Sequence, residues 1–322
     1  MAVTGGLTEI IATTLRNRSG KLADNVSNNN ALLQRLSKKG NIKPVSGGRT
    51  IVQEIEYAEN GTYTRYSGYE TLNISPSDVI TGAEFDWKQA AVAVTMSGLE
   101  MLQNAGREQV IDLLESRISN AERTFKNQMS TDIYSDGTAS GGKQIGGLQL
   151  LIADTGLSTV GGISSTTYAW WRNQVYDFST AGVTPSSATI QTAMNTLFLQ
   201  AARGTDVPDL IVADNTYYRY YWESLQSIQR ITSESTAGAG FKALQFLGSD
   251  VVFDGGQDGA APSSHMYFVN SNYLFFRPHR ERNMVPLDSD RYATNQDAVV
   301  KLIGFAGNMT VSNRALQGVI VA

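Results

Sequence analysis

One long helix is the feature of this sequence that most restricts its fold. Between Gly106 and about Ile133, apolar side chains recur at spacings of three and four residues, which places them in a single stripe on a helix. At 1.5 Å per residue such a helix is about 42 Å long, well above the usual length in globular proteins. It needs an equally long surface to cover its stripe. The stripe consists of Val110, Leu114, Ile118, Ala121, Phe125 and Met129.

The flanks of this helix carry start and stop signals. Ser97 and Glu100 have the spacing of a capping box, which predicts a short first helix. Asn104 and Gly106 predict an interruption before the long helix, and Asp136-Gly137 predicts its end.

Residues 50–71 predict a β-hairpin. Ile51, Ile55 and Tyr57 alternate with polar side chains at period two, and Glu59-Asn60-Gly61 supplies a turn. The return strand would run through residues 62–69. A third extended run is expected over residues 84–96.

The second half of the chain predicts a compact α+β unit. Its expected order over residues 185–297 is helix, strand, helix and then three strands. The helices are expected at 189–202 and 215–231, and the strands at 209–213, 243–253, 266–270 and 273–277, with further strands near 298–304, 308–312 and 317–321.

Charge is unevenly distributed along the chain. Residues 1–50 hold eight basic and two acidic side chains, a net charge of +6, whereas the whole chain has a net charge of −4. A basic arm on an acidic body indicates contact with something anionic, either acidic protein or nucleic acid, although a solvated tail has the same composition. The arm includes a short amphipathic helix expected at 7–15 and a helical turn at 31–36.

Several function classes find no support in the sequence. There is no cysteine, and the two histidines, His265 and His279, lack the spacing of a metal-binding pair. The glycines at 141–142 and 146–147 are not followed by the lysine and hydroxyl of a phosphate-binding loop. The segment 254–259 lacks the terminal glutamate of an EF-hand. We therefore expect no enzyme, no cofactor and no metal. No membrane helix and no leader peptide are expected either.

The predicted hairpin is more apolar than a solvated loop needs to be. A two-stranded hairpin alone is marginally stable in water. Its tyrosines combine a large apolar surface with a polar tip, which is typical of protein interfaces. The hairpin therefore either folds onto its own domain or lies across another subunit.

The order of these features resembles a known family. Four stretches are similar to segments of phage capsid proteins: residues 99–106 (LEMLQNAG), 146–149 (GGLQ), 168–172 (YAWWR) and 208–212 (PDLIV). With the arm, hairpin, helix pair and α+β unit in this order, nearly the whole chain resembles the Hong Kong 97-type fold of tailed-phage major capsid proteins.

The resemblance implies a division of the chain and a function. Residues 1–45 would be an N-terminal arm, 46–95 an extended loop, 96–184 with 298–322 a peripheral domain around the long helix, and 185–297 an axial domain. The chain would self-assemble through pentamers and hexamers into the icosahedral head shell that encloses double-stranded DNA. It would be assembled in the host bacterial cytoplasm and reside in the virion.

The resemblance also implies partners and contact residues. The partners would be other copies of the chain, portal and scaffolding proteins, a candidate decoration protein and, weakly, the packaged DNA. No lysine lies between Lys43 and Lys88, so the lysine cross-link that the type member forms from its extended loop is not expected. The expected subunit contacts on the loop are Ile55, Tyr57, Asn60, Gly61, Tyr63, Arg65, Tyr66 and Tyr69, and the basic residues of the interior arm are Arg16, Arg18, Lys21, Arg35, Lys38 and Lys39.

Two alternatives stay open at this point. An encapsulin, the shell protein of a cellular nanocompartment, has the same fold and would enclose a cargo enzyme instead of DNA. A nucleic-acid-binding protein driven by residues 1–50 would bind DNA tightly, with a steep dependence on salt, without assembling.

Overall fold

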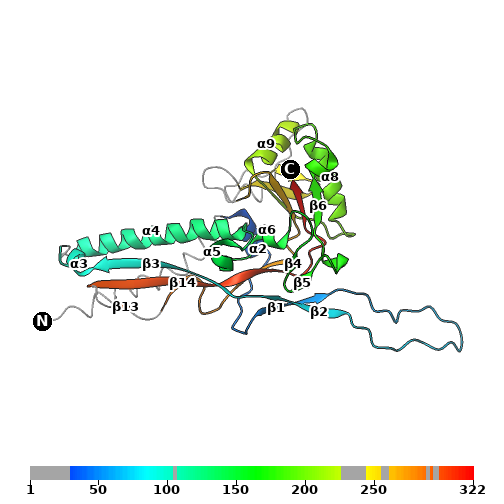
Figure 1. Ribbon diagram of the computed structural model, residues 1–322, viewed down its shortest axis with the longest axis horizontal. Helices are drawn as coiled ribbons and strands as arrows, with labels where there is room; N and C mark the ends of the chain where they lie inside the picture. The colour runs from blue at the N-terminus through cyan, green and yellow to red at the C-terminus, as the bar shows by residue number, and fades with distance from the viewer. Residues whose placement is uncertain (1–29, 104–106, 226–243, 255–260, 288–290, 293–296) are drawn as a thin grey trace.

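The computed structural model describes residues 30–103, 107–225, 244–254, 261–287, 291–292 and 297–322. The molecule is elongated (Figure 1). A long helix lies along a pair of long strands at one end. A sheet covered by helices forms the bulk beside it, and a narrow ribbon projects from the other end (Figure 1). The expected mixed α+β fold is confirmed.

The first sheet is built around the longest strand, β14 (Ala298–Val311). Strand β3 (Lys88–Ser97) pairs with it antiparallel over ten residues, from Ala298 opposite Ser97 to Gly307 opposite Lys88. Helix α4 (Arg107–Ile133) packs along β3 (Figure 1). The remaining strands that pair with β14 are β11 (Leu274–Pro278), β12 (Val285–Pro286) and β13 (Arg291–Tyr292).

The predicted long helix is confirmed, and its stripe covers this sheet. Ile118, Phe125 and Met129 are at most 3% exposed. The side chains of Val110 and Leu114 lie outside the described part. The predicted capping box also forms: the Ser97 amide donates to the Glu100 carboxylate at 3.0 Å, and the Glu100 amide donates to Ser97 Oγ at 3.3 Å. It begins α3 (Gly98–Gln103). The predicted interruption falls at residues 104–106, outside the described residues.

The second sheet has six strands in the order β6-β15-β10-β7-β9-β8, with both parallel and antiparallel pairs. Both faces are buried, as its runs of Val, Ile and Leu require. Along the central strand β7, Leu210 and Val212 join the larger core, while Ile211 and Ala213 face helices α8 and α9. The elements are β6 (Gln174–Asp177), β7 (Leu210–Ala213), β8 (Leu244–Phe246), β9 (Ser249–Phe253), β10 (His265–Val269), β15 (Gly318–Val321), α8 (Ile190–Gln200) and α9 (Asn215–Ser224).

The two sheets cross the expected domain boundaries. Strands β6 and β15 were expected in the peripheral domain, but they lie in the six-stranded sheet with β7. Strands β11 to β13 were expected in the axial domain, but they pair with β14. The chain leaves the six-stranded sheet after β10 and enters the first sheet at β11. A domain boundary at residue 297 would therefore separate β11, β12 and β13 from β14, the strand with which they pair.

Short elements connect these layers. Gly147 shows how tightly they pack, because a Cβ added there would lie 2.3 Å from the carbonyl oxygen of Ile133. The connecting elements are α2 (Ala31–Lys38), α5 (Ala139–Gly142), α6 (Leu148–Leu151), β4 (Thr159–Val160), β5 (Ile163–Ser164), a 3-10 turn (Ala169–Trp171) and α7 (Phe178–Ala181).

The predicted hairpin over residues 50–71 is wrong in its pairing. Strand β1 (Ile51–Glu56) does pair antiparallel, but its partner is β2 (Ile80–Phe85) and not residues 62–69. The segment 57–79 contains no strand and forms a long loop beyond the ladder. A turn does form close to the expected position, where the Tyr63 amide donates to the Asn60 carbonyl at 3.5 Å, but it does not join two paired strands.

Candidate functional site: an exposed ribbon and its base

The most unusual surface of the molecule is the ribbon, defined here as β1, β2 and the loop 57–79 between them. One face of the β1–β2 ladder is anchored on the body: Ile51, Ile55 and Phe85 are buried in the larger core. The ladder continues one step further, since the Tyr57 amide donates to the Val79 carbonyl at 3.0 Å. Beyond that step the loop projects alone into solvent (Figure 1).

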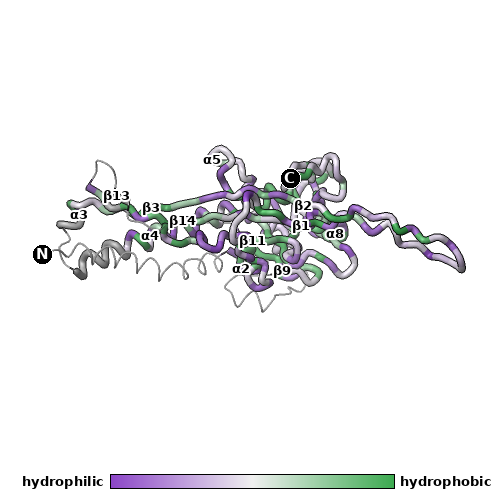
Figure 2. The backbone as a smooth tube through the Cα atoms, turned by 90° about the horizontal axis from the view of Figure 1, so that it is seen from below, coloured by the Kyte–Doolittle hydropathy of each residue, from purple (hydrophilic) through white to green (hydrophobic). Residues whose placement is uncertain are grey.

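The projecting loop displays large apolar side chains. Tyr69 and Ile74 are 107% and 90% exposed, and Tyr63 is 78% exposed. Figure 2 shows apolar segments alternating with polar ones along the ribbon. A loop of this length without secondary structure is uncommon unless it has a function, and contiguous exposed apolar surface is typical of interaction sites. The exposed apolar side chains of the loop also include Tyr66 and Leu72.

A few hydrogen bonds hold the two sides of the loop together. Asn60 Oδ1 accepts from the Thr62 amide at 3.0 Å and from Ser77 Oγ at 3.2 Å. Asn60 Oδ1 therefore links the two sides of the loop near its start.

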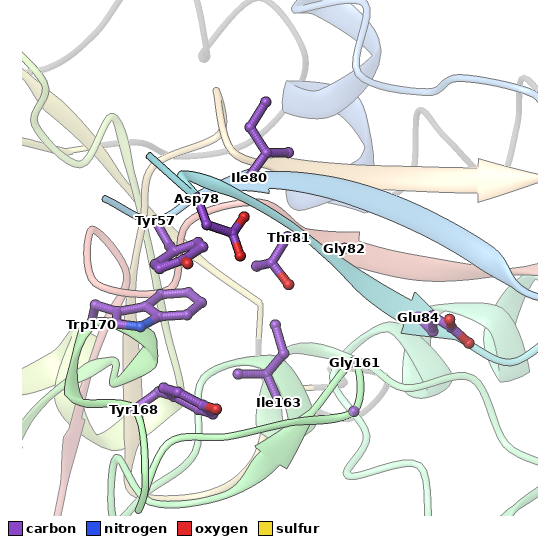
Figure 3. Close-up of a pocket in the computed structure, with 11 residues that line it drawn as sticks. Tyr57, Asp78, Ile80, Thr81, Gly82, Glu84, Gly161, Ile163, Tyr168 and Trp170 are labelled. Carbon is purple, nitrogen blue, oxygen red and sulfur yellow. The ribbon is translucent and has the colours of Figure 1, made fainter. Parts of the chain in front are cut away.

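A pocket of about 480 Å³ lies at the base of the ribbon (Figure 3). One wall is the start and end of the ribbon, with Tyr57, Asp78 and Thr81, and the opposite wall is the segment 161–170. Tyr57 stacks on Trp170, with ring centroids 5.3 Å apart and planes inclined by 24°. The Trp170 ring in turn lies against the Tyr168 ring, with ring centroids 5.9 Å apart. Ile163 lines the floor (Figure 3).

The second half of the N-terminal arm is anchored on the body of its own chain. Asn30 caps α2, and Leu32, Leu33 and Leu36 are at most 1% exposed. Arg35 Nε lies 2.9 Å from Asp209 Oδ2, and Lys39 Nζ lies 3.2 Å from the same oxygen.

Asp209 is held ionised at this anchor. Burial by itself raises the pKa of Asp209, but hydrogen bonds from Ser271 and the positive charges of Arg35 and Lys39 outweigh it and leave the pKa below its ordinary value. Residues 41–45 then run parallel to β11, where the Lys43 amide donates to the Phe276 carbonyl at 3.0 Å.

The structure places the predicted contact residues of the loop differently. Ile55 is buried in the core of its own chain and so is not a direct subunit contact, whereas Tyr57 is half-buried at the base of the ribbon and Asn60 is exposed. Gly61, Tyr63, Arg65, Tyr66 and Tyr69 are exposed on the projecting loop.

The basic arm residues are placed unevenly. Arg35 and Lys39 pair with Asp209 and are not free for an anionic partner, whereas Lys38 is exposed. Arg16, Arg18 and Lys21, with the helix expected at 7–15, lie outside the described residues.

Sequence reasoning did not find the base pocket. Its residues Asp78, Ile163 and Trp170 come from segments far apart in the sequence. Ile74 and Leu72 were also missed, because the predicted hairpin ended before them. The only available signal was the aromatic run at 168–171, which indicates a packed cluster but not its partner.

Within the described ranges, no group of three or more His, Asp or Glu side chains is arranged to hold a metal ion. The helices described there are all too short or too polar to cross a membrane.

Comparison with known proteins gives a result at the level of structure. A scan of the sequence against protein-family models gives no match, and a search of curated protein sequences gives none. Solved structures do match. The capsid asymmetric unit of cyanophage A-1(L) aligns with a TM-score of 0.64 at 15% identity, over 88% of this chain and 90% of that chain.

This chain has the Hong Kong 97-type capsid fold. The capsid of the Myoviridae phage XM1 matches with a TM-score of 0.52 at 14% identity, over 88% of this chain and 90% of that one. The capsid of a native GTA particle matches with a TM-score of 0.53 at 11% identity, over 89% of each chain. These alignments span most of both chains, so the likeness extends to the whole architecture and not only to one sheet.

Proposed function

We propose that this chain is the major capsid protein of a tailed bacteriophage, which builds the icosahedral head shell through pentamers and hexamers and encloses double-stranded DNA. The observation that carries the proposal is the projecting loop 57–79, whose large apolar side chains are exposed and not covered by any described part of their own chain. The fold supports it, because similar chains are capsid components.

The contacts between subunits would be heterologous. The ribbon of one copy and the surface that receives it on the next are different parts of the chain, and such contacts close into rings when the rotation between subunits permits. Rings of five and six copies are then expected from the same chain. Portal and scaffolding proteins, and a decoration protein, are proposed as further partners, and the protein would reside in the virion.

The described part of the arm modifies the proposed role of the basic charges. Because Lys39 pairs with Asp209 and Arg35 pairs with Asp209 and Asp250, weak contact with DNA is proposed only for the residues before the anchor, including Arg16, Arg18 and Lys21. Replacing these three by Glu is expected to lower particle yield or DNA content and to leave the circular dichroism of the subunit unchanged.

The test of shell formation removes the loop without disturbing the body. Residues 58–78 are replaced by Asn-Gly, which forms a tight two-residue turn between paired strands. Tyr57 and Val79 already face each other across the ladder, so β1 and β2 stay paired. We expect folded, soluble subunits that form no closed shell in electron micrographs.

A matched control keeps the loop and its length but changes Tyr63, Tyr66, Tyr69 and Ile74 to Thr. It should also fail to form shells, because the apolar surface and not the loop length carries the contact. Normal shells from both variants would refute the proposal. Particles of the unmodified chain that contain a protein cargo and no DNA would favour the encapsulin alternative.

A further inference from the structure

The pocket at the ribbon base combines aromatic walls with a carboxylate that has no partner. Tyr57 on the ribbon wall stacks on Trp170 of the opposite wall, and Trp170 contacts Tyr168, so the three rings form one aromatic cluster that joins the two walls. The exposed carboxylate of Asp78 lies beside Tyr57 and Thr81 (Figure 3). Within the part of the chain that the structure describes, Asp78 makes no side-chain hydrogen bond or ion pair, and no Lys or Arg lines the pocket.

This combination has the chemistry of a guanidinium site. A guanidinium plane stacks on aromatic faces, and its N–H groups donate to a carboxylate at the same time. A lysine ammonium satisfies the carboxylate but stacks less well, because it is a compact and strongly hydrated charge. An apolar ligand would leave Asp78 without a partner in a partly desolvated pocket.

One arginine of the same ribbon fits this requirement. Arg65 is the only basic residue in the loop 57–79. It is exposed, and its guanidinium carbon lies 5.9 Å from the centroid of the Tyr63 ring in the same loop. The loop is otherwise acidic, with Glu59, Glu70 and Asp78. Arg65 follows Tyr57 by eight residues and stands near the middle of the loop 57–79, toward the outer end of the ribbon and away from the pocket at its base.

We propose that the base pocket of one copy receives the Arg65 guanidinium from the ribbon of a second copy. The inference rests on the proposed function and assigns it a specific contact. The donor and the acceptor lie at opposite ends of one ribbon, so the contact runs head to tail and can repeat around a ring. Each subunit then gives one arginine and receives one.

A charge exchange tests the pairing. Arg65→Glu and Asp78→Arg are each expected to lower the equilibrium constant of a subunit contact about tenfold or more, since each loses the attraction and adds a like-charge pair. Shell yield from each single variant should fall accordingly. The double variant should recover most of the yield. The control is a second double variant, Arg65→Glu with Glu59→Arg, which changes another exposed carboxylate of the loop and should not recover the shell yield.

Co-expression separates contacts between copies from contacts within one copy. When Arg65→Glu chains and Asp78→Arg chains are mixed, alternating copies restore opposite charges at every contact of a six-membered ring and at four of the five contacts of a five-membered ring. Mixed shells should therefore form at a yield well above that of either variant alone. If Arg65 reached the pocket of its own chain, both chains would keep a repulsive pair and the mixture would fail.

The outcomes are distinguishable from failure of the proposed function. Unmodified chains that give shells, together with a mixture and a double variant that do not recover, overturn the pairing and leave the shell function intact. Unmodified chains that form no ring or shell overturn both. Full yield from each single variant also overturns the pairing.

Discussion

Arg314 offers the sharpest test of how the body of this protein is held together. Its side chain is fully buried. It donates to the Leu151 carbonyl at 2.7 Å, the Trp171 carbonyl at 3.1 Å and Asn173 Oδ1 at 2.9 Å. A fourth bond, of 2.9 Å, goes to Ser158 Oγ. Among the described residues no carboxylate pairs with it, so four neutral acceptors hold one buried cation.

The cation stays charged at neutral pH. Desolvation lowers the pKa of Arg314 to about 10, which is still well above 7. Arg314→Met keeps much of the apolar volume but removes all four donors. The Leu151 and Trp171 carbonyls then lose the donor that Arg314 supplied, at about 1–3 kcal/mol each. Relief of the buried charge offsets part of this, so we expect a net loss of about 3 kcal/mol in the free energy of unfolding.

Urea unfolding followed by tryptophan fluorescence measures this loss, because the Trp171 ring lies 5.8 Å from the guanidinium. The melting temperature should fall by roughly 6 °C. Arg314→Lys should recover only part of the loss, since one ammonium does not reach four acceptors placed around a planar fork. The matched control is Arg282→Met at an exposed site, expected within about 0.5 kcal/mol of the unmodified protein. Equal effects of Arg314→Met and Arg282→Met would refute the reasoning.

Three further predictions concern the same body. Burial by itself lowers the pKa of His265, but the contact of its Nε2 with Asp154 Oδ1 at 3.2 Å and the hydrogen bond of its Nδ1 with the Ser263 carbonyl together raise it above its ordinary value. Stability from these contacts is present below the unfolded pKa of about 6.5 and should be lost as pH rises through the raised pKa. His265→Asn should flatten this dependence in unfolding measured from about pH 6 to 9. Asp209→Asn should loosen α2 and expose residues 30–45 to limited proteolysis, and unchanged protease resistance of the variant would count against the anchor. Because the Asp209 pKa is lowered, the anchor of the unmodified protein should weaken only as pH falls below about 4. Gly147→Ala places a Cβ 2.3 Å from a backbone carbonyl and should cost several kcal/mol in urea unfolding. Gly162→Ser, at a φ of +77° but in open space, should cost only about 1 kcal/mol.

Local patterns in the sequence predicted local structure well. The capping box at Ser97 and Glu100, the long helix up to Ile133 and the inward face of β1 all follow from side chains within one turn or one strand of each other. These features depend on periodicity and short-range hydrogen bonds, which the sequence displays directly.

Pairings between distant residues were not predictable in the same way. Strand β1 has a nearby polar turn at 59–61, yet it pairs with β2, because Ala83 and Phe85 give an apolar face that matches Ile51 and Ile55 in the core. The segment 62–69 offers tyrosines on both faces and no such match. The ion pair between Arg35 and Asp209 spans 174 positions, and nothing in the local charge pattern of the arm indicates it.

The separation between body and ribbon is itself an argument about function. The β1–β2 ladder buries its apolar face on the body and ends at Tyr57 and Val79, so the core is complete without the loop beyond. A loop whose apolar side chains contribute nothing to the core gives no stability to an isolated subunit, and it adds surface that promotes association. The exposed tyrosines of the loop can contribute free energy by burial only when another molecule covers them. Among the described residues Asp78 of the base pocket also has no side-chain partner, which is expected if the pocket and the loop are the two halves of the proposed contact.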